Sequence, residues 1–149
     1  MSSELPHDLP RLLSSAERLM TRRLAAELEA ESCSVEEWRV LALLSDGRGH
    51  TMSDVAEYAL MPAPSLTKLV DRMASAALLY RRKDPGDGRR VLVYLSARGR
   101  TRHRAVSVLA RRAQEQVLDE TPGVRELMDG LGRLESLLRR APEQVRAER

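Results

Sequence analysis

Residues 79–99 read LYRRKDPGDGRRVLVYLSARG, and this stretch decides how the rest of the chain is interpreted. Strand-forming runs at 79–82 and 91–95 flank a turn at 84–90 that is rich in proline, glycine and charge. Two such runs joined by turn residues predict a β-hairpin. The tip of this hairpin carries three charged residues, Asp87, Arg89 and Arg90. The hairpin is therefore predicted to present charge to solvent.

The segment before the hairpin has the pattern of a helix that follows a sharp turn. Two prolines within 61–64 predict the turn, because proline suits the start of a helix and not its interior. Apolar residues then recur at helical spacing over 65–79 and predict a helix with one buried face. Four polar or charged residues are left to project outward: Thr67, Lys68, Asp71 and Arg72.

Two short helices are predicted further upstream from their capping residues. Ser34 followed by Glu37 predicts a capping box at the start of a helix over 35–44. Thr51 or Ser53 is expected to cap the next helix.

Longer amphipathic helices are predicted at both ends of the chain. Apolar residues at spacings of three and four indicate helices over 8–30, from about 97 to 120, and over 124–138. Ser96 is expected to cap the second of these. The extreme ends, 1–6 and 141–149, are expected to be frayed. The fold class predicted is mainly α with a small β-hairpin wing.

The charge of the chain is concentrated in its middle. Residues 62–104 contain eleven Lys or Arg and three Asp or Glu, a net charge of +8, whereas 1–61 carry −5 and 105–149 are neutral. A strong local positive charge on a protein of net charge +3 is expected of a surface that meets a polyanion. The alternative is a solvated basic face without a partner.

A helix, a turn, an outward-facing polar helix and a basic hairpin together make a winged helix-turn-helix. The second helix of such a unit fits the major groove of DNA, where short polar and basic side chains reach base edges. An Arg at the hairpin tip can enter the narrower, more negative minor groove. The rival interpretation is a protein–protein interaction module, since a winged helix can also present this surface to a protein.

The wing sequence resembles that of the MarR family of multiple-antibiotic-resistance regulators. In that family an Asp-x-Arg lies at the wing tip and a Leu-Ser/Thr-x-x-Gly opens the next helix; here they read Asp87-Gly88-Arg89 and 95–99. The resemblance covers about residues 33–104, and the flanking helices by arrangement only. One departure is Ala77, at a position where the family usually has glycine.

The resemblance implies roles for individual residues. Arg89 would insert into the minor groove while Asp87 braces the wing, and Arg90 would add to its positive charge. The helix at 65–79 would act as the recognition helix. Its residues implied to contact DNA are Ser65, Thr67 and Lys68 in the major groove and Arg72 near phosphate.

The resemblance also implies an assembly. It predicts a single domain over 1–149, in which 34–97 form the winged helix-turn-helix and the helices at 8–30 and 99–140 form a homodimer. Such a dimer would bind a pseudo-palindromic duplex operator and repress transcription until a small aromatic or phenolic ligand releases it. A regulator without ligand response, or an activator, remains the alternative within DNA binding.

Other kinds of site are weakly indicated. The single cysteine, Cys33, is interpreted as a structural thiol, with redox sensing as the alternative. The three histidines are scattered and predict no metal site, and no cofactor is expected. Trp38 is interpreted as core packing. No catalytic motif is present, so we do not expect an enzyme. We expect a cytoplasmic regulator without a membrane partner.

Overall fold

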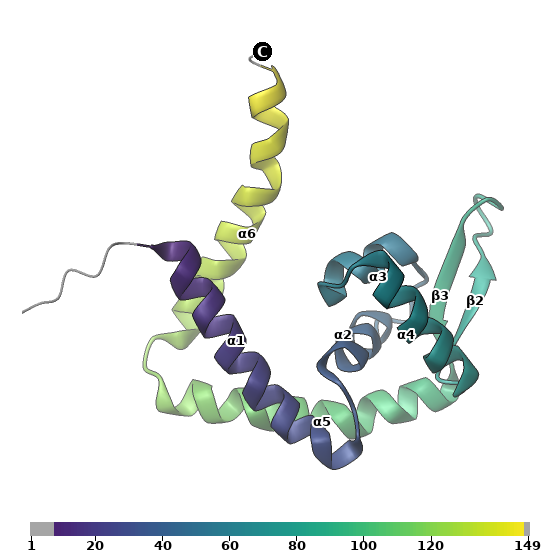
Figure 1. The fold of residues 1–149 in the computed structure, drawn as a ribbon, viewed down its shortest axis with the longest axis horizontal. Coiled ribbons are helices and arrows are strands. Elements are labelled where there is room, and N and C mark those ends of the chain that lie inside the picture. The colour runs from purple at the N-terminus through teal and green to yellow at the C-terminus, as the bar shows by residue number, and fades with distance from the viewer. Residues whose placement is uncertain (1–7, 148–149) are drawn as a thin grey trace, which may run out of the picture. The chain divides into compact units, whose positions relative to one another are not determined.

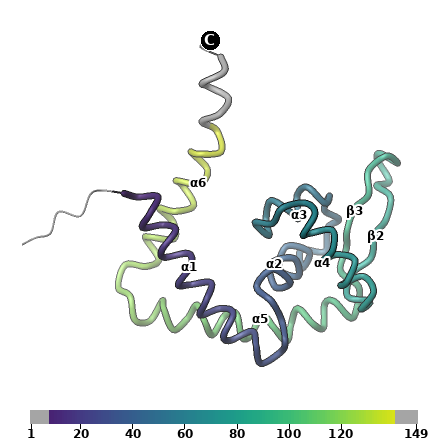
Figure 2. The backbone as a smooth tube through the Cα atoms, viewed as in Figure 1, coloured from purple at the N-terminus to yellow at the C-terminus, as the bar shows by residue number. Residues whose placement is uncertain are grey.

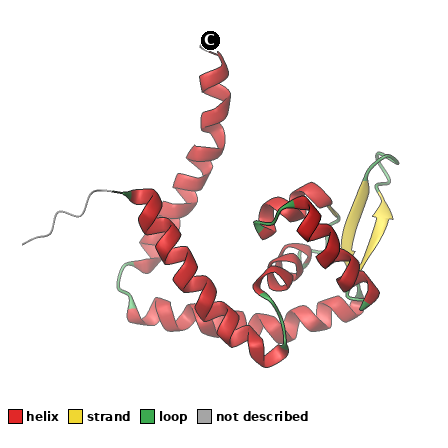
Figure 3. Cartoon of the chain, in the orientation of Figure 1, coloured by secondary structure: helices red, strands yellow, loops and turns green. Residues whose placement is uncertain are grey.

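The structure, a computed structural model, describes residues 8–147, with side chains described for 8–140. The helices are α1 (Leu9–Leu28), the 3-10 helix η1 (Glu29–Glu31), α2 (Val35–Leu44), α3 (Met52–Ala59), α4 (Ala63–Ser75), α5 (Ala97–Glu120) and α6 (Val124–Ala147) (Figure 1). The strands are β1 (His50–Thr51), β2 (Leu79–Lys83) and β3 (Val91–Leu95), of which β2 and β3 form the hairpin drawn in yellow in Figure 3. This is the predicted fold class, mainly α with a β-hairpin wing. The chain divides after Ala113 into two compact units.

The first unit has an aliphatic core to which every helix from α1 to α5 contributes. Because the chain has no Phe, leucine, valine and methionine fill this core. The largest fully buried side chains are Leu28, Leu41, Leu44, Leu66, Met73, Val40, Val55, Val70, Val93 and Val106. Burial of this kind contributes about 1.5–3 kcal/mol per large side chain. The inner face predicted for the recognition helix is confirmed as far as Met73, since Leu66, Val70 and Met73 are buried, whereas Ala77, also predicted on this face, lies beyond the end of the helix and is exposed.

The sheet contains a strand that the sequence pattern does not reveal. Its order is β1-β3-β2, with antiparallel pairs in which His50 lies opposite Val93 and Tyr80 opposite Tyr94. The Tyr80 and Tyr94 rings stack at 5.4 Å between centroids. A Cβ on Gly49 would overlap the Tyr94 ring, so a side chain where the chain enters β1 would require that ring to move.

The recognition helix is shifted relative to its predicted bounds. It begins at Ala63, with Pro62 as N-cap and a proline in its first turn, and it ends at Ser75 rather than at residue 79. The reason lies at Ala77, whose φ of +57° is in the left-handed region. This conformation turns the chain out of the helix and into β2, as the backbone trace shows (Figure 2).

We expect Ala77→Gly to stabilise the protein. The left-handed conformation costs about 1–2 kcal/mol for a residue with a Cβ, and glycine would remove this cost. Glycine also gives the unfolded chain more conformational freedom, which lowers stability by about 0.4–1 kcal/mol. The free energy of urea-induced unfolding should therefore rise by between about zero and 1.6 kcal/mol. A loss of stability would show that the turn has no backbone strain to relieve.

The helix caps agree with the sequence in part. The Thr51 hydroxyl accepts from the Asp54 N–H at 3.2 Å and the Asp54 carboxylate accepts from the Thr51 N–H at 2.9 Å, a full capping box. The Ser34 hydroxyl accepts from the Glu37 N–H at 3.0 Å. The predicted return bond from Glu37 is wrong, because the Glu37 carboxylate accepts from Arg102 instead.

The first and last helices, α1 and α6, carry apolar side chains that are left exposed. On α1 these are Leu9, Leu12 and Leu19, and on α6 they are Leu127, Met128, Leu131, Leu137 and Leu138. The α6 backbone continues to Ala147, so the expected fraying from residue 141 is wrong as far as 147, while residues 1–6 lie outside the described part. No helix among the described residues is long and apolar enough to cross a membrane.

Candidate nucleic-acid interface

The outward face of α4 presents the residues expected to contact DNA. Ser65, Thr67, Lys68 and Arg72 are all exposed. Because they are three and four residues apart, Ser65, Lys68 and Arg72 share one side of the helix. They line a groove of about 470 Å³ together with residues 60–62 at the turn before α4. Thr67 lies next to this side, and its hydroxyl donates to the Ala63 carbonyl at 3.0 Å.

The wing tip is held in shape by two aspartates that bind backbone amides. The Asp87 carboxylate accepts from the Arg89 N–H at 3.1 Å, and the Asp87 carbonyl accepts from the Arg90 N–H at 2.9 Å. The Asp84 carboxylate accepts from the Gly86 N–H at 2.9 Å, a brace that the sequence analysis missed. The sequence feature that predicts this hydrogen bond is an Asp followed two residues later by a turn residue, here Asp84 and Gly86.

Asp87 therefore fixes the backbone of Arg89 and leaves its guanidinium unpaired. Within the side chains described, 8–140, no hydrogen bond or ion pair of the Arg89 guanidinium is present, and the residue is exposed. The wing thus carries a cation on a rigid tip. This geometry suits insertion between two phosphate strands.

An ion pair fastens the wing to the recognition helix. The Arg81 guanidinium donates to the Asp71 carboxylate at 2.6 Å. The pair is about half exposed on its acidic side, so its contribution to stability is small. The ion pair instead helps to set the orientation of β2 relative to α4, because Arg81 lies on β2 and Asp71 lies on α4.

A tighter joint lies where the wing meets α5. The Ser96 hydroxyl lies 2.6 Å from the Ala77 carbonyl oxygen and accepts from the Gly99 N–H at 2.9 Å. The Ser96 N–H donates to the Leu78 carbonyl at 3.0 Å. A Cβ on Gly99 would overlap that same carbonyl oxygen. The Leu-Ser-x-x-Gly sequence is therefore a cap combined with a close backbone approach.

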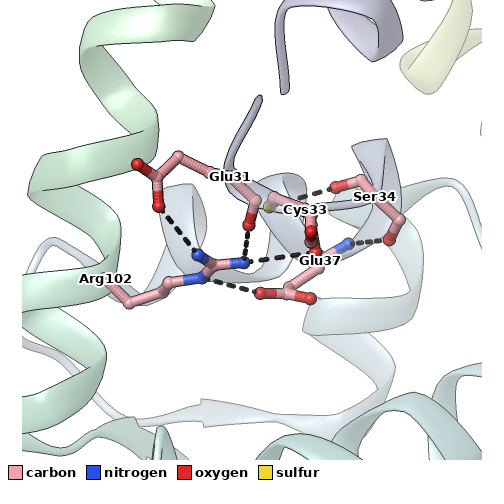
Figure 4. Close-up of polar contacts among 6 residues, drawn as sticks. Glu31, Cys33, Ser34, Glu37 and Arg102 are labelled. Atoms are coloured by element: carbon pink, nitrogen blue, oxygen red, sulfur yellow. Dashed lines mark hydrogen bonds and ion pairs between the residues drawn. The ribbon is translucent and has the colours of Figure 1, made fainter. Parts of the chain in front are cut away.

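Arg102 forms a partly buried junction between helices that its sequence position does not reveal; Figure 4 shows its contacts. Its guanidinium donates to the carboxylates of Glu37 and Glu31 at 3.2 and 3.3 Å, and to the backbone carbonyls of Glu31 and Ser32 at 2.8 and 3.3 Å. It thereby joins α5 to η1 and α2. The sequence feature that indicates this contact is the acidic cluster at 29–37, because several carboxylates close together attract a cation from a neighbouring helix.

The internal ion pairs reduce the charge available to a partner. Of the eleven cations in 62–104, Arg102 and Arg81 are neutralised by carboxylates of the same chain, and Arg100 donates to the Leu95 carbonyl at 3.3 Å. The local charge of +8 already counts Asp71, so only the pairing of Arg102 with Glu31 and Glu37, which lie outside 62–104, lowers it further. The cations on α4 and at the wing tip remain exposed.

Cys33 is buried beside the Arg102 cluster, and its thiol is inert by environment. It is 5% exposed, and its Sγ lies 3.4 Å from the Ser34 carbonyl oxygen. Burial, aided by the negative charge of Glu37, raises the pKa of Cys33 from its usual 9.0 to about 12. A reactive sensor needs the opposite shift.

We expect Cys33 to resist alkylation in the folded protein. A rise in the pKa of Cys33 from 9.0 to about 12 lowers the thiolate fraction near neutral pH about a thousandfold. Iodoacetamide should therefore react far faster in urea than in buffer, as mass spectrometry would detect. The neutral thiol adds stability that is present below pH 9.0 and is lost as pH rises through about 12. Rapid alkylation of the folded chain would contradict this assignment.

Trp38 and His103 form a stacked pair between α2 and α5. Their ring centroids are 5.5 Å apart with an interplanar angle of 3°, and Trp38 packs against the core as predicted. Burial lowers the pKa of His103. Among the described residues no group of three His, Cys, Asp or Glu is arranged to hold a metal ion.

Residues 34–90 match the family model described as MarR family. The chain is 32% identical over 88 residues to the HTH-type transcriptional regulator FarR of Neisseria gonorrhoeae, which covers 59% of this chain and 60% of that relative. The chain thus aligns with less than two thirds of the relative's length.

Two solved structures share the fold at modest identity. NadR in complex with 4-hydroxyphenylacetate is 26% identical with a TM-score of 0.77, covering 94% of this chain and 99% of that one. The transcriptional regulator SPO1453 from Silicibacter pomeroyi DSS-3 is 28% identical with a TM-score of 0.69, covering 84% of this chain and 96% of that one.

Proposed function

Since this chain belongs to the MarR family, we propose that it is a homodimeric repressor that binds duplex DNA and is released by a small aromatic acid. The observation that supports the proposal is the presence of two exposed cationic features on the first compact unit. These are the α4 face with Lys68 and Arg72, and the braced wing tip with an unpaired Arg89.

The proposed contacts follow from the shapes of the two features. An α-helix fits the major groove, so Ser65, Thr67 and Lys68 would meet base edges and Arg72 a phosphate. Arg89 at the exposed tip of the hairpin would enter the minor groove, with Asp87 as its brace. Arg90 would add a phosphate contact beside it.

The proposed dimer rests on the exposed apolar residues of the outer helices. Leu12 and Leu19 on α1 and Leu127 and Leu131 on α6 are left uncovered by their own units. Paired across a two-fold axis, 8–30 and 99–140 could bury an interface on the order of 2,000 Å² or more, while 34–97 bind DNA. The whole chain, 1–149, would then act as one MarR-like domain. Sedimentation that shows a folded monomer at micromolar concentration would refute the dimer.

The DNA-binding function is tested by footprinting and salt titration. A dimer should protect a pseudo-palindrome whose half-sites are about 10 base pairs apart. Its affinity should fall with salt at a log–log slope of about −0.9 for each phosphate neutralised. Protection of one short asymmetric site would contradict the dimer, and a flat salt response would favour the rival protein-interaction module.

The proposed ligand class comes from the relatives. NadR was solved with 4-hydroxyphenylacetate, a phenolic carboxylate, and is 26% identical to this chain. We expect the protein to be a cytoplasmic regulator. A compound of this class should lower its affinity for DNA when titrated against a preformed protein–DNA complex. If DNA stays bound across a panel of aromatic acids, the alternative of a regulator without ligand response is favoured. A transcription assay separates repression from activation.

A further inference from the structure

The first turn of α4 is unusually apolar for a helix proposed to read DNA bases. The residues from 60 to 64 are Leu-Met-Pro-Ala-Pro, and the prolines have no N–H to donate. Leu60 is 69% exposed, and Pro62, Ala63 and Pro64 are exposed as well. This turn has no acidic residue, and its N-cap, Pro62, makes no side-chain hydrogen bond. It therefore offers a partner apolar surface and few hydrogen-bonding groups.

Thr67 extends this apolar surface by one turn. Its hydroxyl donates to the Ala63 carbonyl at 3.0 Å, so its hydrogen is used within the helix. The exposed side chain is left with a methyl group and a weak acceptor. Lys68, the next residue, is the first outward residue of α4 with a charged donor.

We propose that Ala63, Pro64 and Thr67 read the 5-methyl group of thymine in the major groove, an inference that rests on the proposed DNA binding. The N-terminal residues of a recognition helix are those that reach base edges. Thymine alone among the four bases presents a methyl group there, and alanine or the threonine methyl is its usual apolar contact. Lys68 suits the acceptor atoms of a neighbouring guanine.

The inference is tested with DNA that lacks only the methyl groups. A duplex is first selected from a randomised library, and each thymine of its half-sites is then replaced by deoxyuridine. Affinity is measured by fluorescence anisotropy at one fixed salt concentration. Loss of each contacted methyl should weaken binding roughly fourfold, the factor expected for one buried methyl-sized group.

Variants of Thr67 assign the effect to this side chain. Thr67→Ser keeps the hydroxyl and its bond to Ala63 but lacks the methyl, so the thymine-to-uracil affinity ratio should fall toward one at its position. Thr67→Val keeps a methyl and should keep the ratio. Thr101→Ser is the matched control, because the Thr101 hydroxyl bonds to the Ala97 carbonyl in the same way, at 3.3 Å, on α5.

The outcomes separate this inference from the function on which it rests. If no duplex is selected, the DNA-binding proposal and the inference fall together. If a duplex is selected but uracil binds as tightly as thymine, only the inference is overturned. An unchanged ratio in Thr67→Ser, or an equal change in Thr101→Ser, overturns the assignment to Thr67.

Discussion

Replacing Arg89 by alanine should cost about 1–3 kcal/mol of DNA-binding free energy per half-site, roughly five- to 150-fold in affinity for each wing. The loss should be largest on sites with A·T-rich flanks, where the minor groove is narrow and its potential most negative. Asp87 braces the backbone N–H of Arg89 and not its guanidinium, so the wing should keep its shape. Electrophoretic mobility shifts on the selected operator measure the effect.

Stability measurements and a matched arginine control this experiment. Because the guanidinium has no partner among the side chains of 8–140, Arg89→Ala should change unfolding by less than about 0.5 kcal/mol. Arg112→Ala removes the same charge about 20 Å along α5 from the wing base and should bind DNA nearly as the parent does. Arg100 is unsuitable, since it donates to the Leu95 carbonyl. A parent-like Arg89→Ala beside a weakened Arg112→Ala would refute the wing assignment.

Gly99→Ala should be the most destabilising of the small substitutions considered. The new Cβ would overlap the Leu78 carbonyl oxygen and crowd the Leu95 side chain, and the first of these is backbone that cannot swing away. Overpacking at such a contact costs about 1–3 kcal/mol and here falls at the upper end. The Ser96 cap that bonds to Leu78 and Gly99 would be disturbed at the same time. Urea unfolding monitored by circular dichroism measures the loss.

Gly88→Ala is the matched control for this substitution. Gly88 lies on the wing tip with no atom within 4 Å of its would-be Cβ, and its φ is not positive. Its free energy of unfolding should stay within about 0.5 kcal/mol of the parent. If Gly99→Ala is as stable as Gly88→Ala, the close approach between α5 and the wing is not a constraint on the fold.

The elements with long, regular patterns could be predicted from sequence, and those set by tertiary contacts could not. The hairpin, Ser96 and the helix over 8–30 follow from periodicity and turn chemistry. By contrast, β1 has two residues and exists only because β3 pairs with it. The end of α4 could not be predicted, because Ala77 adopts a left-handed backbone conformation that an alanine does not ordinarily indicate.

The same division holds for the candidate interface. Outward positions on α4 and the wing cations follow from helical spacing and from the turn. Which cations are free does not, because ion pairing depends on what other elements bring near. Arg102 is spaced like a surface residue of α5, yet its acceptors come from two elements distant in sequence, the end of η1 at Glu31 and Ser32 and helix α2 at Glu37.

The stacked pair of Trp38 and His103 gives the protein an internal optical reporter. Trp38 is the only tryptophan in the chain, so all indole emission comes from the contact between α2 and α5. A charged imidazolium quenches indole fluorescence, and burial holds the pKa of His103 below its usual 6.5. Emission should therefore dim only in mildly acidic buffer. At neutral pH any change in brightness reports movement of these two helices, with no dye attached.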